Sequence, residues 1–307
     1  MMIPTFPTAS ITSGTITTAV TAHQGVYTID ALGLTVTLVL VAVSALVAYL
    51  LKLDVGGKLI WAAIRSFVQL MVMGFIITYI ITANNPWFVI AVIAVMILAA
   101  VEITLTRTSN IPHGLALPVL LTLAVTATFM VSVATELIIK PDTWYSPQVL
   151  VPMAGMLLGN LVSAVAVAMS RFFSDMENRR YEVEAYLSLG ATPFEAARPS
   201  IMEAIRLGLV PTISSLASSG IVLIPGMMSG QIMAGGNPLE AAKYQFVILA
   251  IISALTLLGD TMIMLLIYHR CFTKDGQYFQ PKPRGESHLF EWLKVHVHHH
   301  ENKVNAK

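Results

Sequence analysis

The chain has 307 residues, of which 56% are hydrophobic and only 11% are charged, and its formal net charge is +1. Soluble domains carry about 25% charged residues, so this composition excludes an ordinary soluble protein and is typical of one embedded in a lipid bilayer. The single cysteine, Cys271, excludes a disulfide framework and a thiolate metal cage, and no basic patch with interleaved aromatic residues indicates a nucleic-acid partner.

The chain begins with a threonine-rich stretch, 1–30, that contains no lysine or arginine and so lacks the basic start of a cleaved signal peptide. We expect it to be an extracytoplasmic N-terminal segment. Seven apolar stretches follow, each near the ~20 residues that a membrane-spanning helix needs. They lie near 31–51, 59–81, 87–106, 115–139, 148–170, 201–224 and 245–268. The sequence therefore predicts an all-α polytopic integral membrane protein, with about seven transmembrane helices over 31–270.

The basic residues fall on one side of this arrangement. Every lysine and arginine except Lys140 and Lys243 lies in or beside the connections and the tail that share the side of the C-terminus. By the positive-inside rule, the N-terminus is then outside and the polar tail, 271–307, is cytoplasmic. The connection at about 171–200 falls on the cytoplasmic side too.

This cytoplasmic connection is predicted to contain a helix that stops and a helix that starts immediately afterwards. Gly190 occupies the position just past a helix end, where only glycine takes a left-handed backbone cheaply. Thr192 then begins a capping box, with Pro193 at the first helical position and Glu195 reaching back. A stop and a restart so close together predict a rigid corner outside the membrane.

The corner resembles the coupling loop of ABC-transporter permeases, in which Glu-Ala-Ala is followed by Gly six residues after the Glu. Glu184, Ala185 and Gly190 match this pattern, and Tyr186 replaces the second Ala. An ordinary polar loop with a capped helix is the alternative. The residues that we expect to couple to an ATPase are Glu184, Ala185, Gly190, Ala191, Thr192, Pro193 and Glu195.

Polar side chains inside apolar stretches are costly in hydrocarbon and usually face the protein interior or water. Glu203 could pair with Arg206 at a helix start, and Glu102 could pair with Arg107 or with a cation. Asp260 lies far in sequence from any basic residue, so it is either a functional acid or one satisfied by neighbouring Ser, Thr or backbone groups. The candidates for a translocation path are Arg65, Gln69, Glu102, Asn160, Glu203 and Asp260.

Asn160 follows a GxxxG step formed by Gly155 and Gly159, which lets two helix backbones approach closely, and the Asn amide can bond across them. Helix packing is the default interpretation of this step.

The stretch 224–238 is apolar, rich in Gly and Met, and contains proline near both ends. Irregular backbone at membrane depth is tolerated only when it is buried or lines a cavity, so we expect a re-entrant outer gate here. Its methionines could touch a soft metal ion or serve as packing filler. The predicted gate residues are Pro225, Gly226, Met227, Met228, Gly230 and Gln231.

Two further features concern metals and ATP. The tail carries a cluster of imidazoles, which could sense a metal or bind one adventitiously: His296, His298, His299 and His300. No phosphate-binding GxxxxGK[ST] motif is present, so we expect this chain to bind no cofactor and any ATP to be hydrolysed by a separate subunit.

Several runs together are similar to the FetB/YbbM family of ABC permeases, whose plant relatives are aluminium-tolerance half-transporter permeases. The similarity covers roughly 31–273 and is carried by Arg65-Ser66-Phe67-Val68-Gln69-Leu70, Gly155-Met156, Gly159-Asn160, Leu189-Gly190-Ala191-Thr192, Pro211-Thr212 and Pro225-Gly226-Met227-Met228-Ser229-Gly230-Gln231-Ile232. The resemblance implies a permease in a bacterial inner membrane that pairs with an ATP-binding subunit. In bacteria the family is linked to iron export, and in plants to aluminium tolerance or a nucleotide sugar.

We therefore expect the transmembrane subunit of an ABC exporter of metal ions, iron foremost. Because two ATPase subunits enclose two ATP molecules, a permease with one corner needs a second copy, which predicts a homodimer. The alternatives are an ATP-independent secondary transporter or channel, whose cation would bind Glu102 or Asp260, and a membrane anchor for a signalling ATPase.

Overall fold

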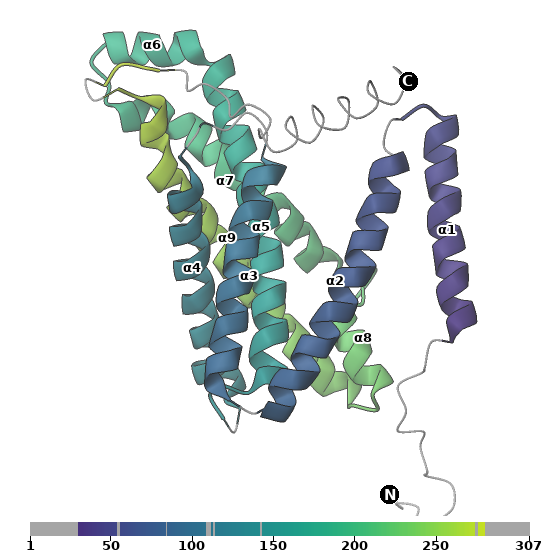
Figure 1. Ribbon diagram of the computed structural model, residues 1–307. Helices are drawn as coiled ribbons and strands as arrows, with labels where there is room; N and C mark the ends of the chain where they lie inside the picture. Colours follow the sequence, from purple (N-terminus) through teal and green to yellow (C-terminus); the bar gives the residue numbers. More distant parts are fainter. Residues whose placement is uncertain are drawn as a thin grey trace, which may run out of the picture. The chain divides into compact units, whose positions relative to one another are not determined.

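The computed structural model describes residues 30–53, 56–83, 85–108, 112, 114–141, 143–273 and 276–279. Within these ranges, regular secondary structure is helical, and strand pairing is limited to two isolated β-bridges (Figure 1). The predicted N-terminal segment and the four tail histidines lie outside the described residues. The chain divides into two units, 1–67 with 224–245, and 68–223 with 246–307, which we describe separately.

The first unit contains α1 (Ala31–Leu50), the beginning of α2 (Gly56–Ala83), α8 (Gly226–Met233) and the beginning of α9 (Pro238–Ile267). The chain leaves α1 through Lys52, which has a left-handed backbone with φ 54°. A Cβ atom on Gly56 would lie 2.9 Å from the carbonyl oxygen of Ala45. The glycine therefore lets the start of α2 lie directly against α1.

The second unit is a bundle built around α5 (Pro147–Asn178), which packs on α3, α4 and α7. Of its most apolar 18 residues, 61% are buried, compared with 44% for the corresponding windows of α4 and α9. Its other elements are α3 (Pro86–Arg107), α4 (Ala116–Val133), the π-helix η1 (Ala134–Ile139), α6 (Arg180–Ser188), α7 (Pro193–Ser218), the 3₁₀ helix η2 (Tyr268–Cys271) and the remainder of α2 and α9. Leu157, Leu161 and Val165 repeat at the helical period and are fully buried, so one face of α5 forms the core.

The predicted spans correspond to helices of the structure. Among the described residues, six helical segments are long and apolar enough to cross a membrane: α1, α2, α3, α4 with η1, α5, and α9 with η2. The remaining predicted span, 201–224, corresponds to α7, which begins and ends earlier than expected. A capping box starts it at Pro193, and Gly220, with φ 83°, turns the chain just after Ser218.

The predicted gate segment is more regular than we expected. Residues 226–233 form helix α8, and the chain breaks only afterwards, where Gly235 has φ 87° and the Gly236 amide donates to the Gln231 carbonyl at 2.9 Å. Pro225 stands at the N-cap, before the helical hydrogen bonds that a proline would interrupt. One internal glycine weakens a helix by about 1 kcal/mol and does not stop it, so composition alone overstated the irregularity.

Beyond α9 the chain returns to the α5–α6–α7 end of the bundle. Phe272 pairs with Tyr278 in an isolated bridge, and the Tyr278 hydroxyl donates to the Met176 carbonyl of α5 at 3.1 Å. Burial raises the pKa of Tyr278 to about 12. The ring of Phe194, at the start of α7, meets Tyr268 edge-on at a centroid distance of 5.5 Å. These contacts brace the corner from the side of η2.

Tyr278→Phe should lower the free energy of unfolding by about 0.5–1.5 kcal/mol, because only the hydroxyl donated to Met176 is lost. Tyr181→Phe is the matched control, since Tyr181 is 82% exposed on α6. The midpoint of thermal unfolding in detergent measures both variants. Equal midpoints for the two variants would show that the hydrogen bond from Tyr278 to Met176 does not stabilise the protein.

Candidate functional site

Helix α6 lies at one end of the second unit, between the ends of α5 and α7 (Figure 1). It ends at Ser188, with Leu189 as the C-cap; the next residue, Gly190, has φ 90°, and the Ala191 amide donates to the Tyr186 carbonyl at 3.0 Å. This is the Schellman arrangement, in which a left-handed glycine allows the chain to satisfy the last helical carbonyls. The predicted helix stop is therefore present.

Helix α7 restarts through the predicted capping box. The Glu195 amide donates to the Thr192 hydroxyl at 3.3 Å, and the Thr192 amide donates to the Glu195 carboxylate at 2.8 Å. Pro193 occupies the first turn. The hydrogen bond from the Thr192 backbone lowers the pKa of Glu195, so the carboxylate stays ionised, and the cap stays closed, to a lower pH than for an unpaired glutamate.

Arg179 joins the three helices of the corner. Its guanidinium contacts Asp175 of α5 at 3.6 Å and Glu182 of α6 at 2.6 Å, and it donates to the Ser200 hydroxyl of α7 at 2.9 Å. The hydrogen bond to Glu182 raises the pKa of Arg179 and lowers that of Glu182. Beside it, Glu184 pairs with Arg180 at 2.8 Å. The corner is thus rigid in both its backbone and its side chains.

The corner also exposes apolar side chains. Tyr181 on α6 is 82% exposed, and Leu189, which caps the end of α6, is 86% exposed. Phe194, at the start of α7, is 40% exposed. Exposed apolar groups on a segment too polar to enter a bilayer are typical of a protein interaction surface.

A buried acid lies where α5, α7 and α9 meet. Asp260 is fully buried, and neither of its carboxyl oxygens has a hydrogen-bond partner among the described residues. A Cβ atom on Gly208 of α7 would collide with the Asp260 carboxylate and lie 3.3 Å from the Ala164 carbonyl oxygen of α5. Gly208 therefore makes the space that Asp260 occupies.

Of the two interpretations of Asp260, the one in which neighbouring Ser, Thr or backbone groups satisfy it finds no such hydrogen bond among the described residues. The nearby hydroxyls of Thr212 and Thr256 lie 3.5 Å from each other, and Thr256 donates to its own helix at the Ile252 carbonyl. An isolated ionised carboxylate is strongly disfavoured in an apolar interior. Asp260 therefore needs a proton or a cation where it lies.

Within the second unit, the structure does not bring the other predicted path residues to Asp260. Glu203 pairs with Arg206 at 3.6 Å on α7. The Asn160 amide donates to the Met156 carbonyl of its own helix at 2.8 Å. Arg65 and Gln69 on α2 and Glu102 on α3 are exposed. No three His, Cys, Asp or Glu side chains gather as a metal site in the part of the chain that the structure describes.

The predicted GxxxG packing step holds for one glycine only. A Cβ atom on Gly155 would lie 3.3 Å from the Met96 side chain of α3, whereas one on Gly159 would meet nothing within 4 Å. Helices α3 and α5 therefore approach closely at Gly155.

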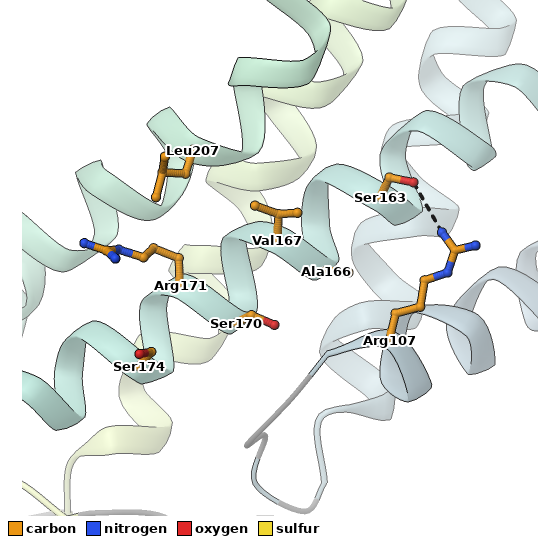
Figure 2. A pocket seen from close by; sticks show the side chains of 8 residues that line it. All are labelled: Arg107, Ser163, Ala166, Val167, Ser170, Arg171, Ser174 and Leu207. Atoms are coloured by element: carbon orange, nitrogen blue, oxygen red, sulfur yellow. Dashed lines mark hydrogen bonds between the residues drawn. The ribbon is translucent and has the colours of Figure 1, made fainter. Parts of the chain in front are cut away.

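A groove of about 700 Å³ lies between α3, α5 and α7 in the second unit (Figure 2). Arg107, the last residue of α3, donates to the Ser163 hydroxyl of α5 at 3.4 Å. Arg171 lies farther along α5 and pairs with Asp175 at 3.5 Å. The residues that line the groove are Arg107, Ser163, Ala166, Val167, Ser170, Arg171, Ser174 and Leu207.

Sequence reasoning missed Arg179, Gly208 and this groove. The spacing of Ser163, Ser170 and Ser174 places three hydroxyls on one helical stripe of α5, which is a signal that could have been found. By contrast, the contacts of Arg179 and Gly208 join distant segments, and no local pattern indicates them.

The fold and the site define a polytopic α-helical membrane protein whose bundle carries a rigid corner at one end. The chain belongs to the family described as Uncharacterised protein family (UPF0014), whose model matches residues 31–272. This agrees with the resemblance to the FetB-type permeases.

Three relatives illustrate the family. A UPF0014 membrane protein of Synechocystis sp. is 34% identical over 73% of this chain and 87% of its own length. Protein ALUMINUM SENSITIVE 3 of Arabidopsis thaliana is 30% identical over 78% of this chain and 86% of its own. The Escherichia coli protein named "Probable iron export permease protein FetB" is 28% identical over 80% of this chain and 93% of its own. No solved structure matches the chain.

Gly208→Ala should destabilise the bundle by about 1–3 kcal/mol, because the added methyl group collides with Asp260. Gly159→Ala is the matched control: it also lies inside a helix but has open space, so it should be neutral or slightly stabilising. In an Asp260→Ala background, the loss caused by Gly208→Ala should be smaller, because the carboxylate that the methyl group meets is gone. An equal loss in both backgrounds, measured by thermal unfolding, would show that the two residues do not share one space.

Proposed function

We propose that this protein is the permease subunit of an ABC transporter that exports metal ions, with iron as the first candidate. The observation that carries the proposal is the rigid, partly apolar corner at α6, which suits an ATPase that pushes on the bundle from outside the membrane. The name of the Escherichia coli relative supports export of iron, and that of the Arabidopsis relative supports a link to metals. The membrane is the inner membrane of a bacterium, with the corner in the cytoplasm.

In this proposal the chain contributes the corner that receives the movement, and a partner subunit contributes the energy of ATP hydrolysis. ATP binds to a separate ATP-binding-cassette subunit, since this sequence has no phosphate-binding GxxxxGK[ST] motif. Two such subunits enclose two ATP molecules, so two permease copies form the working transporter. Leu189 and Tyr181 dock into the ATPase surface, while the caps at Gly190 and Thr192 keep the corner from bending when it is pushed.

Movement of the corner reaches the buried acid through α7. Arg179 fixes the corner to α7 through Ser200, and Gly208 lies on the same helix, against Asp260. A displacement of α7 therefore changes the space around the carboxylate. In this mechanism Asp260 binds the exported cation in one state and releases it in the other. The bound cation neutralises the buried carboxylate.

An ATP-independent cation transporter is the second candidate, and the unpartnered Asp260 favours it. A secondary transporter also needs an intramembrane acid that exchanges its cation. The two candidates differ in their requirement for the corner, because only the ABC permease must bind an ATPase there.

Leu189→Asp should abolish binding of the ATPase and the ATPase stimulation that accompanies it, because it places a charge in an apolar contact. Val222→Asp is the matched control, since Val222 is 85% exposed and lies in the turn after α7, away from the corner. Co-purification with an ATP-binding-cassette subunit, together with vanadate-sensitive ATP hydrolysis, measures the effect. Normal ATPase activity of the Leu189→Asp complex would overturn the coupling role of the corner.

Asp260→Asn should abolish metal efflux from cells while leaving expression and ATPase binding unchanged, because the shape is kept and only the charge is lost. Loading cells with radioactive iron and following its release measures efflux directly. Asp260→Glu is the companion variant, which keeps the charge but is longer and should retain part of the activity. Full efflux by the Asn variant would remove Asp260 from the cation path.

A further inference from the structure

The groove between α3, α5 and α7 has the chemistry of an anion site. Its lining includes two guanidinium groups, from Arg107 and Arg171, and no carboxylate. Asp175 pairs with Arg171 at 3.5 Å, but it also contacts Arg179 at 3.6 Å, so one acid is shared by two bases. Arg107 takes part in no ion pair among the described residues. A net positive charge therefore remains along the groove.

A serine hydroxyl holds one of these guanidinium groups in place. The Ser163 hydroxyl donates to the Gly159 carbonyl at 3.1 Å and accepts from Arg107, so it positions that guanidinium at one end of the groove. Figure 2 shows Arg107 reaching from α3 to Ser163, while Ser170, Arg171 and Ser174 follow along α5 and the Arg171 side chain points away from Arg107. Arginine presents several N–H donors in a planar fork, and this fork matches the oxygens of a phosphate.

The groove also has an apolar part, which a bare phosphate ion would leave unfilled. Ala166 and Val167 of α5 and Leu207 of α7 line it together with the polar groups. Val167 is 42% exposed there. A phosphate that carries an organic group, such as glycerol, would use both the arginines and this apolar surface.

The position of the groove along the helices places it near the surface of the membrane. Helix α3 has 22 residues and ends at Arg107, which is about the length needed to cross the hydrocarbon core. Arg171 follows the apolar part of α5 and precedes its charged end. Phospholipid phosphates lie at this depth, and arginines at helix ends extend toward them.

We propose that this groove is a binding site for a phosphate ester, whose phosphate is bound by Arg107 and whose organic group lies on Val167 and Leu207, while Arg171 adds positive charge from farther along α5. The ester is an anionic phospholipid headgroup or a soluble organic phosphate with the same headgroup chemistry. The site is independent of the proposed export function, because it requires neither the ATPase nor Asp260.

The test is native mass spectrometry of the full chain in detergent, titrated with phosphatidylglycerol, with phosphatidylcholine or with glycerol 3-phosphate. Arg107→Gln should weaken binding of phosphatidylglycerol by about tenfold, which corresponds to the loss of one charge-assisted contact. Arg171→Gln should weaken binding less, because that guanidinium contributes charge without a direct contact. Arg198→Gln is the matched control, because it removes an exposed charge of α7 that does not line the groove. It should bind like the unmodified protein.

The two sources of phosphate give different results. If phosphatidylglycerol binds tightly and glycerol 3-phosphate binds weakly, the groove is a lipid site. If both bind equally, the groove is a site for soluble phosphates. Arg107→Lys keeps the charge and should bind with intermediate affinity, which controls for misfolding of the Gln variant. The proposal is overturned if phosphatidylglycerol binds no better than phosphatidylcholine and glycerol 3-phosphate does not bind. It is also overturned if Arg198→Gln weakens binding as much as the groove variants.

Discussion

Burial of one face of α5 is the constraint on which the second unit depends. Because α5 contacts α3, α4 and α7, each of these helices is positioned by the side chains that α5 offers it. The glycines at the crossings set how closely the helices approach: Gly155 on α5 lies near Met96 of α3, and Gly259 on α9 leaves room for Leu161 of α5. Between helices in lipid, such close contact replaces the hydrophobic effect as the main source of stability.

The same helix carries the features that we connect with function. Its C-terminal end holds Asp175, which anchors Arg179, and so α5 is joined to the corner. Its backbone at Ala164 faces Gly208, where α7 passes the buried acid. A helix of 32 residues that is continuous from the core to the corner can transmit a displacement along its length. This continuity is why we treat the corner and Asp260 as parts of one mechanism.

Polar groups in this protein follow two different rules. At the corner, outside the apolar spans, charges are paired and hydrogen-bonded, so they rigidify the structure and cost little. In the bundle, Asp260 is buried with neither oxygen partnered among the described residues, and the helix opposite it has a glycine to make room. A protein tolerates such an expensive group where it has a use, which is the physical basis for placing function there.

The sequence by itself determined the helical membrane class, the spans and the corner, because each depends on local patterns. Apolar stretches of bilayer length, a left-handed glycine at Gly190 and the Thr192–Glu195 capping box act over a few residues, and their signals survive in the linear chain. Only the tertiary structure decided that Arg179 clamps three helices, that Gly208 accommodates Asp260, and that Arg107 meets the serines of α5. Those contacts join segments far apart in sequence. They are determined by how the helices pack, which local sequence propensity does not encode.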